Sequence, residues 1–165
     1  MFGKLFSKKA NKNEDIFAYA SGSLIKIEDV PDPVFSEKSM GDGIAILPVD
    51  EKILAPADGE IILIAQTKHA LALRTTLGQE LLIHIGLETV KLNGMGIDVL
   101  VRVGDKVTKG QNIANIDLEF IKKNADSTII PMVITNSEEN CFSFDWENVK
   151  EVRAGETKLF RANLK

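Results

Sequence analysis

Residues 66–86, QTKHALALRTTLGQELLIHIG, decide the fold because they form two alternating apolar and polar runs around a turn. Such alternation is typical of half-buried β-strands, and two runs joined by a short glycine-containing turn are typical of a hairpin. The hairpin carries His69 and His84, which are the only two histidines of the chain. The pairing of its strands therefore determines whether the two imidazoles meet.

The predicted register brings them together. With the turn centred on Leu77-Gly78, cross-strand partners have positions that sum to about 155. His69 then lies opposite Gly86, and Leu71 lies opposite His84. The histidines are diagonal neighbours on one face, with Cβ atoms about 7–8 Å apart or less. A one-residue bulge at the glycine of the turn would break this register.

The remainder of the chain favours an all-β fold. Short apolar runs recur between turns rich in glycine and proline, which is typical of an antiparallel β-sandwich or barrel. Only residues 117–126 have helical periodicity, with Asp117 as the predicted cap. Residues 101–107 and 152–158 resemble each other, which hints at an internal duplication. The segments expected to contain strands are 22–30, 41–49, 52–65, 97–116, 127–136, 149–156 and 157–164.

The composition of the chain argues against several classes of function. The chain has 165 residues, which favours one domain. Its net charge of -4 provides no basic field for nucleic acid. No apolar run approaches the roughly 18 residues that a membrane span requires, and the N-terminus lacks the features of a signal peptide. The single cysteine, Cys141, cannot form an internal disulfide, which agrees with a cytoplasmic protein.

Residues 1–14 differ from the remaining domain, 15–165. Phe2, Leu5 and Phe6 recur at helical spacing among lysines, so we expect a mobile basic amphipathic segment. Such a segment could bind weakly to an anionic membrane surface, or it could simply be a solvated terminus.

Two imidazoles on one apolar face suit phosphoryl transfer. A neutral imidazole is a nucleophile, and a second one nearby can donate a hydrogen bond to the transferred group. Thr67 shares the predicted face of His69 and adds a hydroxyl. Structural histidines are the ordinary alternative. A permanent zinc site would need further protein ligands, which the sequence does not provide, although His69 and His84 could share zinc with a partner's carboxylate.

The chain contains the motifs IEDVPDPVFSEKSMGDGIAI, APADGEI, TKHAL, LLIHIGLETVKLNGMGI, GDKVTKGQ and STIIPMVITN. Together these motifs resemble one family, the glucose-type IIA component of the bacterial phosphoenolpyruvate:sugar phosphotransferase system. The resemblance covers about residues 15–165. It implies an antiparallel β-sandwich or flattened barrel with duplicated hybrid motifs and a few short helical turns.

The resemblance also implies a role for each site residue. His84 would accept a phosphoryl group on Nε2 from the phosphocarrier HPr and pass it to a cysteine of a IIB domain. His69 would hydrogen-bond the phosphoryl oxygens. Thr67 matches an active-site threonine, and Gly86 matches the residue whose carbonyl orients the nucleophilic ring. No cofactor is implied beyond the phosphoryl group itself.

An apolar docking surface for HPr and IIB is implied around the histidines. Its members would be Val34, Phe35, Ile44, Leu71, Leu82, Val90 and Leu92. The main alternative function is a regulator that binds transporters or metabolic enzymes according to its phosphorylation state. A lipoyl-type carrier domain would need a lysine at a hairpin tip in the expected context, and a zinc peptidase would need a His-x-His motif. Neither motif is present.

Overall fold

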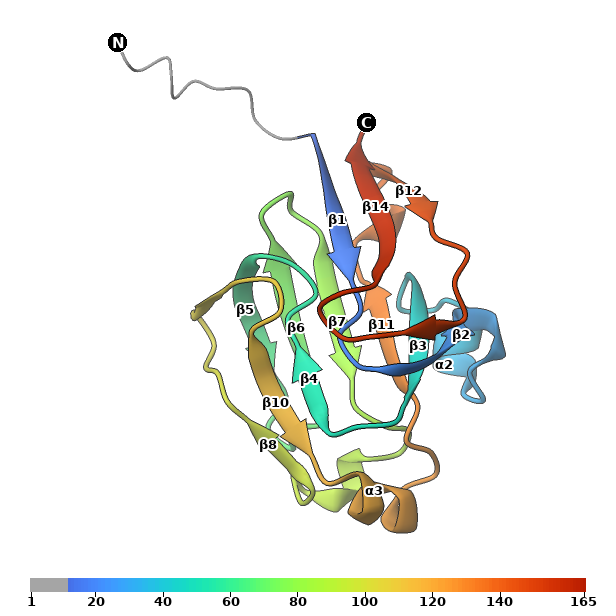
Figure 1. The fold of residues 1–165 in the computed structure, drawn as a ribbon, viewed down its shortest axis with the longest axis vertical. Helices are drawn as coiled ribbons and strands as arrows, with labels where there is room; N and C mark the ends of the chain where they lie inside the picture. Colours follow the sequence, from blue (N-terminus) through green and yellow to red (C-terminus); the bar gives the residue numbers. More distant parts are fainter. Residues whose placement is uncertain (1–11) are drawn as a thin grey trace.

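The computed structural model describes residues 12–165 and contains three antiparallel sheets (Figure 1). The largest sheet has eight strands in the order β13-β2-β3-β11-β7-β6-β5-β9. Two three-stranded sheets have the orders β1-β14-β12 and β4-β10-β8. In the described part of the chain the two-residue strands β13 and β9 end the large sheet without pairing with each other. The predicted all-β sandwich is confirmed, in its open form rather than as a closed barrel, and the internal duplication stays a prediction.

The strands alternate with a few short helices. The strands are β1 (Asn13–Phe17), β2 (Gly22–Lys26), β3 (Asp42–Pro48), β4 (Lys52–Leu54), β5 (Gly59–Ile64), β6 (Ala70–Thr75), β7 (Glu80–His84), β8 (Ile97–Val99), β9 (Lys106–Val107), β10 (Asn112–Ile116), β11 (Ile130–Ile134), β12 (Phe142–Trp146), β13 (Glu151–Val152) and β14 (Lys158–Leu164). The helical elements are η1 (Ile27–Asp29), α2 (Pro33–Ser36), η2 (Val90–Leu92), α3 (Leu118–Asn124) and η3 (Ser137–Glu139).

The two faces of the large sheet have different cores. On β6 and β7, Leu71, Leu73, Leu81 and Ile83 are all 0% exposed and belong to the main core. Each such side chain contributes about 1.5–3 kcal/mol when it is removed from water. The alternate residues of these strands lie on the opposite face, which carries a smaller apolar cluster that includes Phe35 of α2. The histidine site lies beside this smaller cluster.

The hairpin register differs by one residue from the prediction. Ala70, not Leu71, lies opposite His84. The amide of Thr75 donates to the carbonyl of Gln79 at 2.8 Å, which leaves a three-residue loop that ends at Gly78 with φ 104°. Loops of this kind place a glycine in the left-handed region and displace the register. The predicted pairing is therefore wrong. The additional loop residue shifts the register by one, as a one-residue bulge at this glycine would.

The helices agree only in part with the prediction. α3 lies within the predicted segment 117–126, and the carboxylate of Asp117 accepts a hydrogen bond from the amide of Phe120 at 3.1 Å. The helix α2 was not predicted. It begins with Pro33 after Asp32, whose carboxylate accepts from the amide of Val34 at 3.0 Å. An aspartate cap followed by proline is a helix start signal, so the sequence did contain the information.

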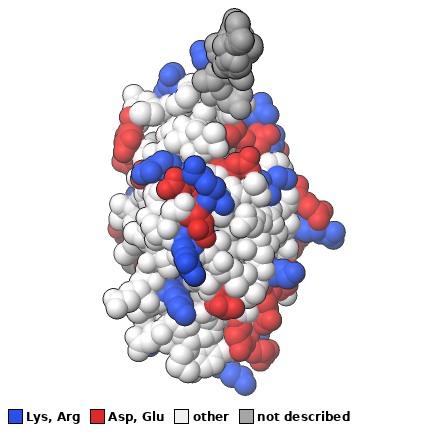
Figure 2. Space-filling view, turned by 90° about the vertical axis from the view of Figure 1, so that its left-hand side faces the viewer, with Lys and Arg blue, Asp and Glu red and all other residues white. Residues whose placement is uncertain are grey.

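Residues 1–11 lie outside the described part of the chain, so the predicted basic amphipathic segment stays a prediction. Asn13 and Glu14, at the end of that predicted segment, belong to β1 and pair with β14. Among residues 12–165, no helix is long and apolar enough to cross a membrane. On the face shown in Figure 2, basic and acidic side chains are interspersed, so this face presents no continuous basic surface.

Candidate functional site

His84 ends β7 on the sheet face that carries the smaller apolar cluster. Its cross-strand neighbour, Ala70, is too small to cover the imidazole. The ring of Phe35 approaches from α2, with ring centroids 5.1 Å apart and planes inclined by 66°. The imidazole therefore has an aromatic edge contact from α2.

A backbone carbonyl orients the ring of His84. Its Nδ1 lies 2.8 Å from the carbonyl oxygen of Gly86. A carbonyl oxygen only accepts hydrogen bonds, so Nδ1 carries the proton and Nε2 keeps a lone pair. Gly86 has φ 77°, and a Cβ there would lie 2.6 Å from Cγ2 of Thr89. Glycine is therefore required where the chain turns back to present this carbonyl.

His69 reaches the same site from the residue before β6. Lys68 has φ 63°, and the carbonyl of His69 accepts from the amide of Ile85 at 2.7 Å. The rings of His69 and His84 have centroids 5.0 Å apart and are inclined by 71°. The predicted convergence of the two histidines is confirmed, although the predicted register does not produce it.

Thr67 holds the second imidazole. Its Oγ1 lies 2.5 Å from Nδ1 of His69. A hydroxyl can donate or accept, so this contact is compatible with either tautomer of His69. When Thr67 donates, Nε2 of His69 carries the proton and can donate to an anion near His84.

Burial lowers the pKa of both histidines. For His84, burial is the largest cause, the hydrogen bond to Gly86 opposes it, and the charge of His69 lowers the pKa further. The carboxylate of Asp32 acts in the opposite direction and raises it. For His69, burial alone lowers the pKa. Both rings are consequently neutral at pH 7, and neutrality is the state in which Nε2 of His84 has a free lone pair.

The histidines lie in a shallow depression with a volume of 510 Å³. Its wall includes three partly exposed apolar side chains, Val34, Leu63 and Val90, which are 46%, 46% and 49% exposed. Exposed apolar side chains grouped around polar groups are typical of a transient docking site. The lining residues are Asp32, Val34, Phe35, Met40, Leu63, Ala65, His69, Ala70, Leu82, His84, Glu88, Thr89 and Val90.

Four predicted docking residues line the depression, and three do not. Those that line it are Val34, Phe35, Leu82 and Val90. Leu71 is 0% exposed in the main core, because the observed register turns it away from His84, and Leu92 is only 9% exposed and packs in that core. Ile44 pairs with the buried Met132 and so lies on the opposite face of the sheet. The placement of these three on an exposed docking surface is wrong.

Sequence reasoning missed seven of the lining residues, namely Asp32, Met40, Leu63, Ala65, Ala70, Glu88 and Thr89. In β5 the register shifts between Ile61 and Leu63, and this irregularity places Leu63 opposite Ala72 on the histidine face. Strict alternation along GEIILI gives no signal for a bulge, so the sequence alone did not reveal Leu63. In residues 12–165, no group of three histidine, cysteine, aspartate or glutamate side chains could hold a metal ion.

Comparison with known proteins shows the family of this chain. Residues 14–140 match the model of the family described as phosphoenolpyruvate-dependent sugar phosphotransferase system, EIIA 1, and the chain belongs to this family. It is similar to proteins named PTS system glucose-specific EIIA component. The one from Halalkalibacterium halodurans is 47% identical over 167 residues, with 96% of each chain covered, and one from Staphylococcus aureus is 44% identical over 166 residues, with 99% of each covered.

A solved structure supports the fold. The chain is similar to the glucose permease IIA from Mycoplasma capricolum, with a TM-score of 0.85 and 33% sequence identity. The match covers 92% of this chain and 96% of that one. The agreement over 92% of this chain means that its sheets are arranged as in that structure.

Proposed function

We propose that this chain is a cytoplasmic phosphocarrier that accepts a phosphoryl group on Nε2 of His84 from phospho-HPr and passes it to a cysteine of a IIB domain. The observation that carries the proposal is the 2.8 Å contact between Nδ1 of His84 and the carbonyl oxygen of Gly86. It assigns the proton to Nδ1 and leaves the Nε2 lone pair free for attack on phosphorus.

The two transfers balance without a further reactant. In the first, the Nε2 lone pair forms a bond to phosphorus while the bond between phosphorus and the donor's histidine breaks, and that electron pair stays on the donor nitrogen. In the second, the thiolate of the IIB cysteine attacks phosphorus, the bond to Nε2 breaks, and His84 regains its lone pair. The carbonyl of Gly86 accepts from Nδ1 throughout and stabilises the positive charge that the ring gains while it carries the phosphoryl group.

His69 is the proposed stabiliser of the transferred group. Its ring centroid lies 5.0 Å from that of His84, close enough for its Nε2–H to reach a phosphoryl oxygen on the neighbouring ring. Phosphoryl transfer depends mainly on positioning and on donors for the equatorial oxygens. The hydroxyl of Thr67 lies 2.5 Å from Nδ1 of His69, and when it donates to that nitrogen the proton of His69 is on Nε2, as this role requires.

The apolar depression is the proposed docking surface for both HPr and IIB. A carrier must bind each partner and release it, so a shallow surface with partly exposed Val34, Leu63 and Val90 suits it better than a deep pocket. The relatives named glucose-specific support a sugar of the glucose class as the cargo of the downstream permease. A zinc ion shared by His69, His84 and a partner's carboxylate is compatible with the same surface.

Residues 1–14 are proposed to keep the carrier near the membrane. Their lysines and phenylalanines support weak attachment, at about 1 kcal/mol for each lysine near an anionic surface. Co-sedimentation of the full chain and of a chain lacking residues 1–11 with anionic vesicles tests this. Equal pelleting of the two forms would contradict it.

The central experiment follows the phosphoryl group. Incubation with phospho-HPr should produce one phosphohistidine, which ³¹P NMR and mass spectrometry should locate on Nε2 of His84. Addition of a IIB domain should then discharge it. A phosphoryl group on Nδ1, on His69, or one that no IIB domain accepts would each overturn the proposal.

A further inference from the structure

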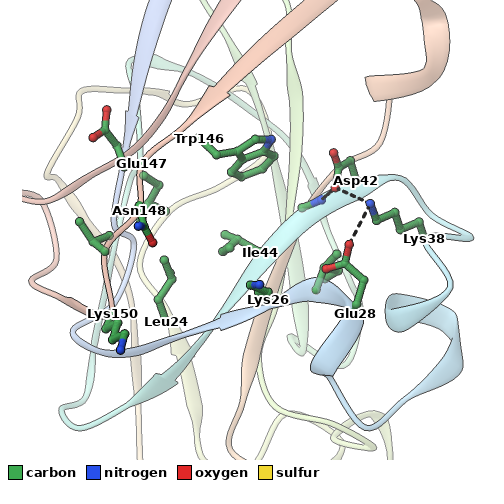
Figure 3. Close-up of a pocket in the computed structure, with 14 residues that line it drawn as sticks. Leu24, Lys26, Glu28, Lys38, Asp42, Ile44, Trp146, Glu147, Asn148 and Lys150 are labelled. Atoms are coloured by element: carbon green, nitrogen blue, oxygen red, sulfur yellow. Dashed lines mark hydrogen bonds and ion pairs between the residues drawn. The ribbon is translucent and has the colours of Figure 1, made fainter.

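Two segments of the chain hold the surroundings of His84. The helix α2, which supplies the aromatic edge contact, is followed by Lys38, whose ammonium pairs with Glu28 at 3.1 Å and with Asp42 at 3.5 Å (Figure 3). These ion pairs connect the end of α2 to η1 and to β3. The second segment is the turn 85–89, which follows β7 and presents the carbonyl that orients the imidazole. The contacts of this turn determine where that carbonyl lies.

The turn 85–89 has a backbone conformation that needs support. Gly86 has φ 77° and Glu88 has φ 60°, so two of its residues are in the left-handed region. A residue with a side chain, such as Glu88, persists in this region only when the surrounding structure holds it there. The amide of Leu87 donates to the carbonyl of Ser127 at 2.9 Å, which fixes the middle of the turn. The beginning of the turn is held by a different group.

That group is the side chain of Thr89, which is 0% exposed. Its hydroxyl donates to the carbonyl of Ile85 at 2.6 Å. Its methyl lies beside Gly86, since a Cβ on that glycine would be 2.6 Å from Cγ2 of Thr89. The amide of Ile85 donates in turn to the carbonyl of His69 at 2.7 Å. One buried side chain therefore contacts both ends of the peptide unit from Ile85 to Gly86, and Ile85 is also connected to the backbone of His69.

We propose that Thr89 is the positioning residue for the nucleophile. Its hydroxyl fixes the plane of the peptide between Ile85 and Gly86, and its methyl limits the space beside Gly86. Rotation of this peptide would displace the next carbonyl along the chain, which is the one that contacts Nδ1 of His84. A reacting group is held in place only when the groups behind it are themselves fixed by hydrogen bonds and packing. The inference rests on the proposed function of His84, and it assigns Thr89 no contact with the phosphoryl group.

Removal of the hydroxyl alone tests this role. Thr89→Val keeps the shape of the side chain and leaves the carbonyl of Ile85 without this donor. The ring ¹⁵N chemical shifts of His84 in the unphosphorylated chain should move from those of the Nδ1–H tautomer towards those of a mixture. The titration midpoint of the ring should fall, because the hydrogen bond to Gly86 raises the pKa of His84. Phospho-acceptance should slow by about 5-fold, which corresponds to one hydrogen bond.

A matched threonine controls for a merely structural effect. Thr75 is 4% exposed, and its hydroxyl donates to the carboxylate of Glu14. It belongs to the same hairpin but lies at the end of β6 that is away from the histidines. Thr75→Val should lower the stability of the fold, as Thr89→Val does. It should leave the ring shifts, the titration midpoint and the acceptance rate unchanged.

The methyl group is tested separately, in chains that retain the hydroxyl. Thr89→Ser keeps the donor to Ile85, so the tautomer of His84 should stay as it is. It also removes the methyl that a side chain at position 86 would meet, so it should raise the acceptance rate of Gly86→Ala by about 3-fold or more. Thr89→Val retains a methyl at this place and should bring no recovery.

The proposal is overturned if Thr89→Val leaves the ring shifts of His84 unchanged, or if Thr75→Val moves them equally. It is also overturned if Thr89→Ser brings no recovery to Gly86→Ala, a result that does not require Thr89→Val to fold. The ring measurements use no phospho-HPr, so their failure concerns Thr89 alone. An unsubstituted chain that phospho-HPr does not phosphorylate would instead refute the proposed function.

Discussion

His84 and His69 lie with ring centroids 5.0 Å apart, yet different kinds of group hold their Nδ1 atoms. For His84 the partner is the backbone carbonyl of Gly86, at 2.8 Å. For His69 it is the hydroxyl of Thr67, at 2.5 Å. A carbonyl only accepts, whereas a hydroxyl can donate or accept. The tautomer of His84 is therefore determined by the backbone, while that of His69 can follow its surroundings.

This difference matches two different tasks. A nucleophile needs its lone pair on the same nitrogen in every cycle, and a main-chain carbonyl held by a glycine turn provides that. A stabilising group has to donate when a phosphoryl group arrives and must tolerate its departure, and a hydroxyl partner that can reverse its role permits both. Single substitutions at His84, His69, Gly86 and Thr67 can separate these two tasks.

The largest effect is expected from His84→Gln, which removes the attacking nitrogen. Phospho-acceptance from phospho-HPr should fall by about 10⁴-fold or more, because the nitrogen that forms the bond to phosphorus is gone. Mass spectrometry of the intact chain after incubation with phospho-HPr measures the incorporation. Stoichiometric phosphorylation of this variant would refute the assignment of the nucleophile.

His69→Gln should separate the two steps. The variant keeps His84 and its carbonyl partner, so it should still accept a phosphoryl group. Onward transfer to IIB should slow by about 100-fold, because a ring donor positioned by Thr67 is replaced by a freely rotating amide. Rapid-quench measurement of both steps provides the comparison. If both steps slow equally, the two histidines do not divide the work as we propose.

The sequence was sufficient to predict the β-sandwich and the meeting of the two histidines, but not the register that presents them. Alternation along 66–86 identified both strands, yet alternation cannot reveal whether a loop contains two residues or three. The left-handed Gly78 made the difference, and it moved Leu71 into the core. His69 reaches His84 because it precedes β6 and follows Lys68, whose φ is positive, a feature that periodicity does not encode.

The docking surface was predicted less well than the histidines, because it is built from elements far apart in the chain. Phe35 and Val34 reach it through α2, which has only four residues. Leu63 lies on this surface because the register shifts within β5. Ile44 does not, because its position on β3 places its side chain on the opposite face of the sheet. Such placements depend on pairings between strands, and no local pattern determines them.

Gly86→Ala should displace the carbonyl that orients the ring of His84, without removing any hydrogen-bonding group. The new Cβ would lie 2.6 Å from Cγ2 of Thr89 in a backbone conformation with φ 77°. We expect a loss of about 1–3 kcal/mol in the free energy of unfolding and slower phospho-acceptance, because the carbonyl must move. Urea denaturation and the acceptance rate are the measurements. An unchanged rate with reduced stability would show that the carbonyl does not orient the nucleophile.

The pH dependence of phospho-acceptance should reflect the neutral state of His84. Burial is the largest cause that lowers its pKa below the ordinary value of about 6.5. Only the neutral ring has the Nε2 lone pair, so the rate should be constant above pH about 6.5 and should fall as the pH drops through the lowered pKa. A rate profile with HPr whose own titration has been measured separately checks this. A midpoint above pH 7 would contradict the role of burial.

The smallest effect is expected from Thr67→Val, which keeps the shape of the side chain and removes the hydroxyl beside Nδ1 of His69. Phospho-acceptance should be unchanged, since His84 keeps its own partner. Onward transfer should slow by about 3- to 5-fold, because one hydrogen bond contributes on the order of 1 kcal/mol and His69 then presents its donor only part of the time. The ring ¹⁵N chemical shifts of His69 should move towards those of a mixture of tautomers, while those of His84 stay constant.

Thr67→Ser retains the hydroxyl and serves as the control. If Thr67→Val disturbs the ring nitrogens of His84 as much as those of His69, the two imidazoles are coupled as one unit, and the division between a backbone-held nucleophile and a hydroxyl-held stabiliser is wrong.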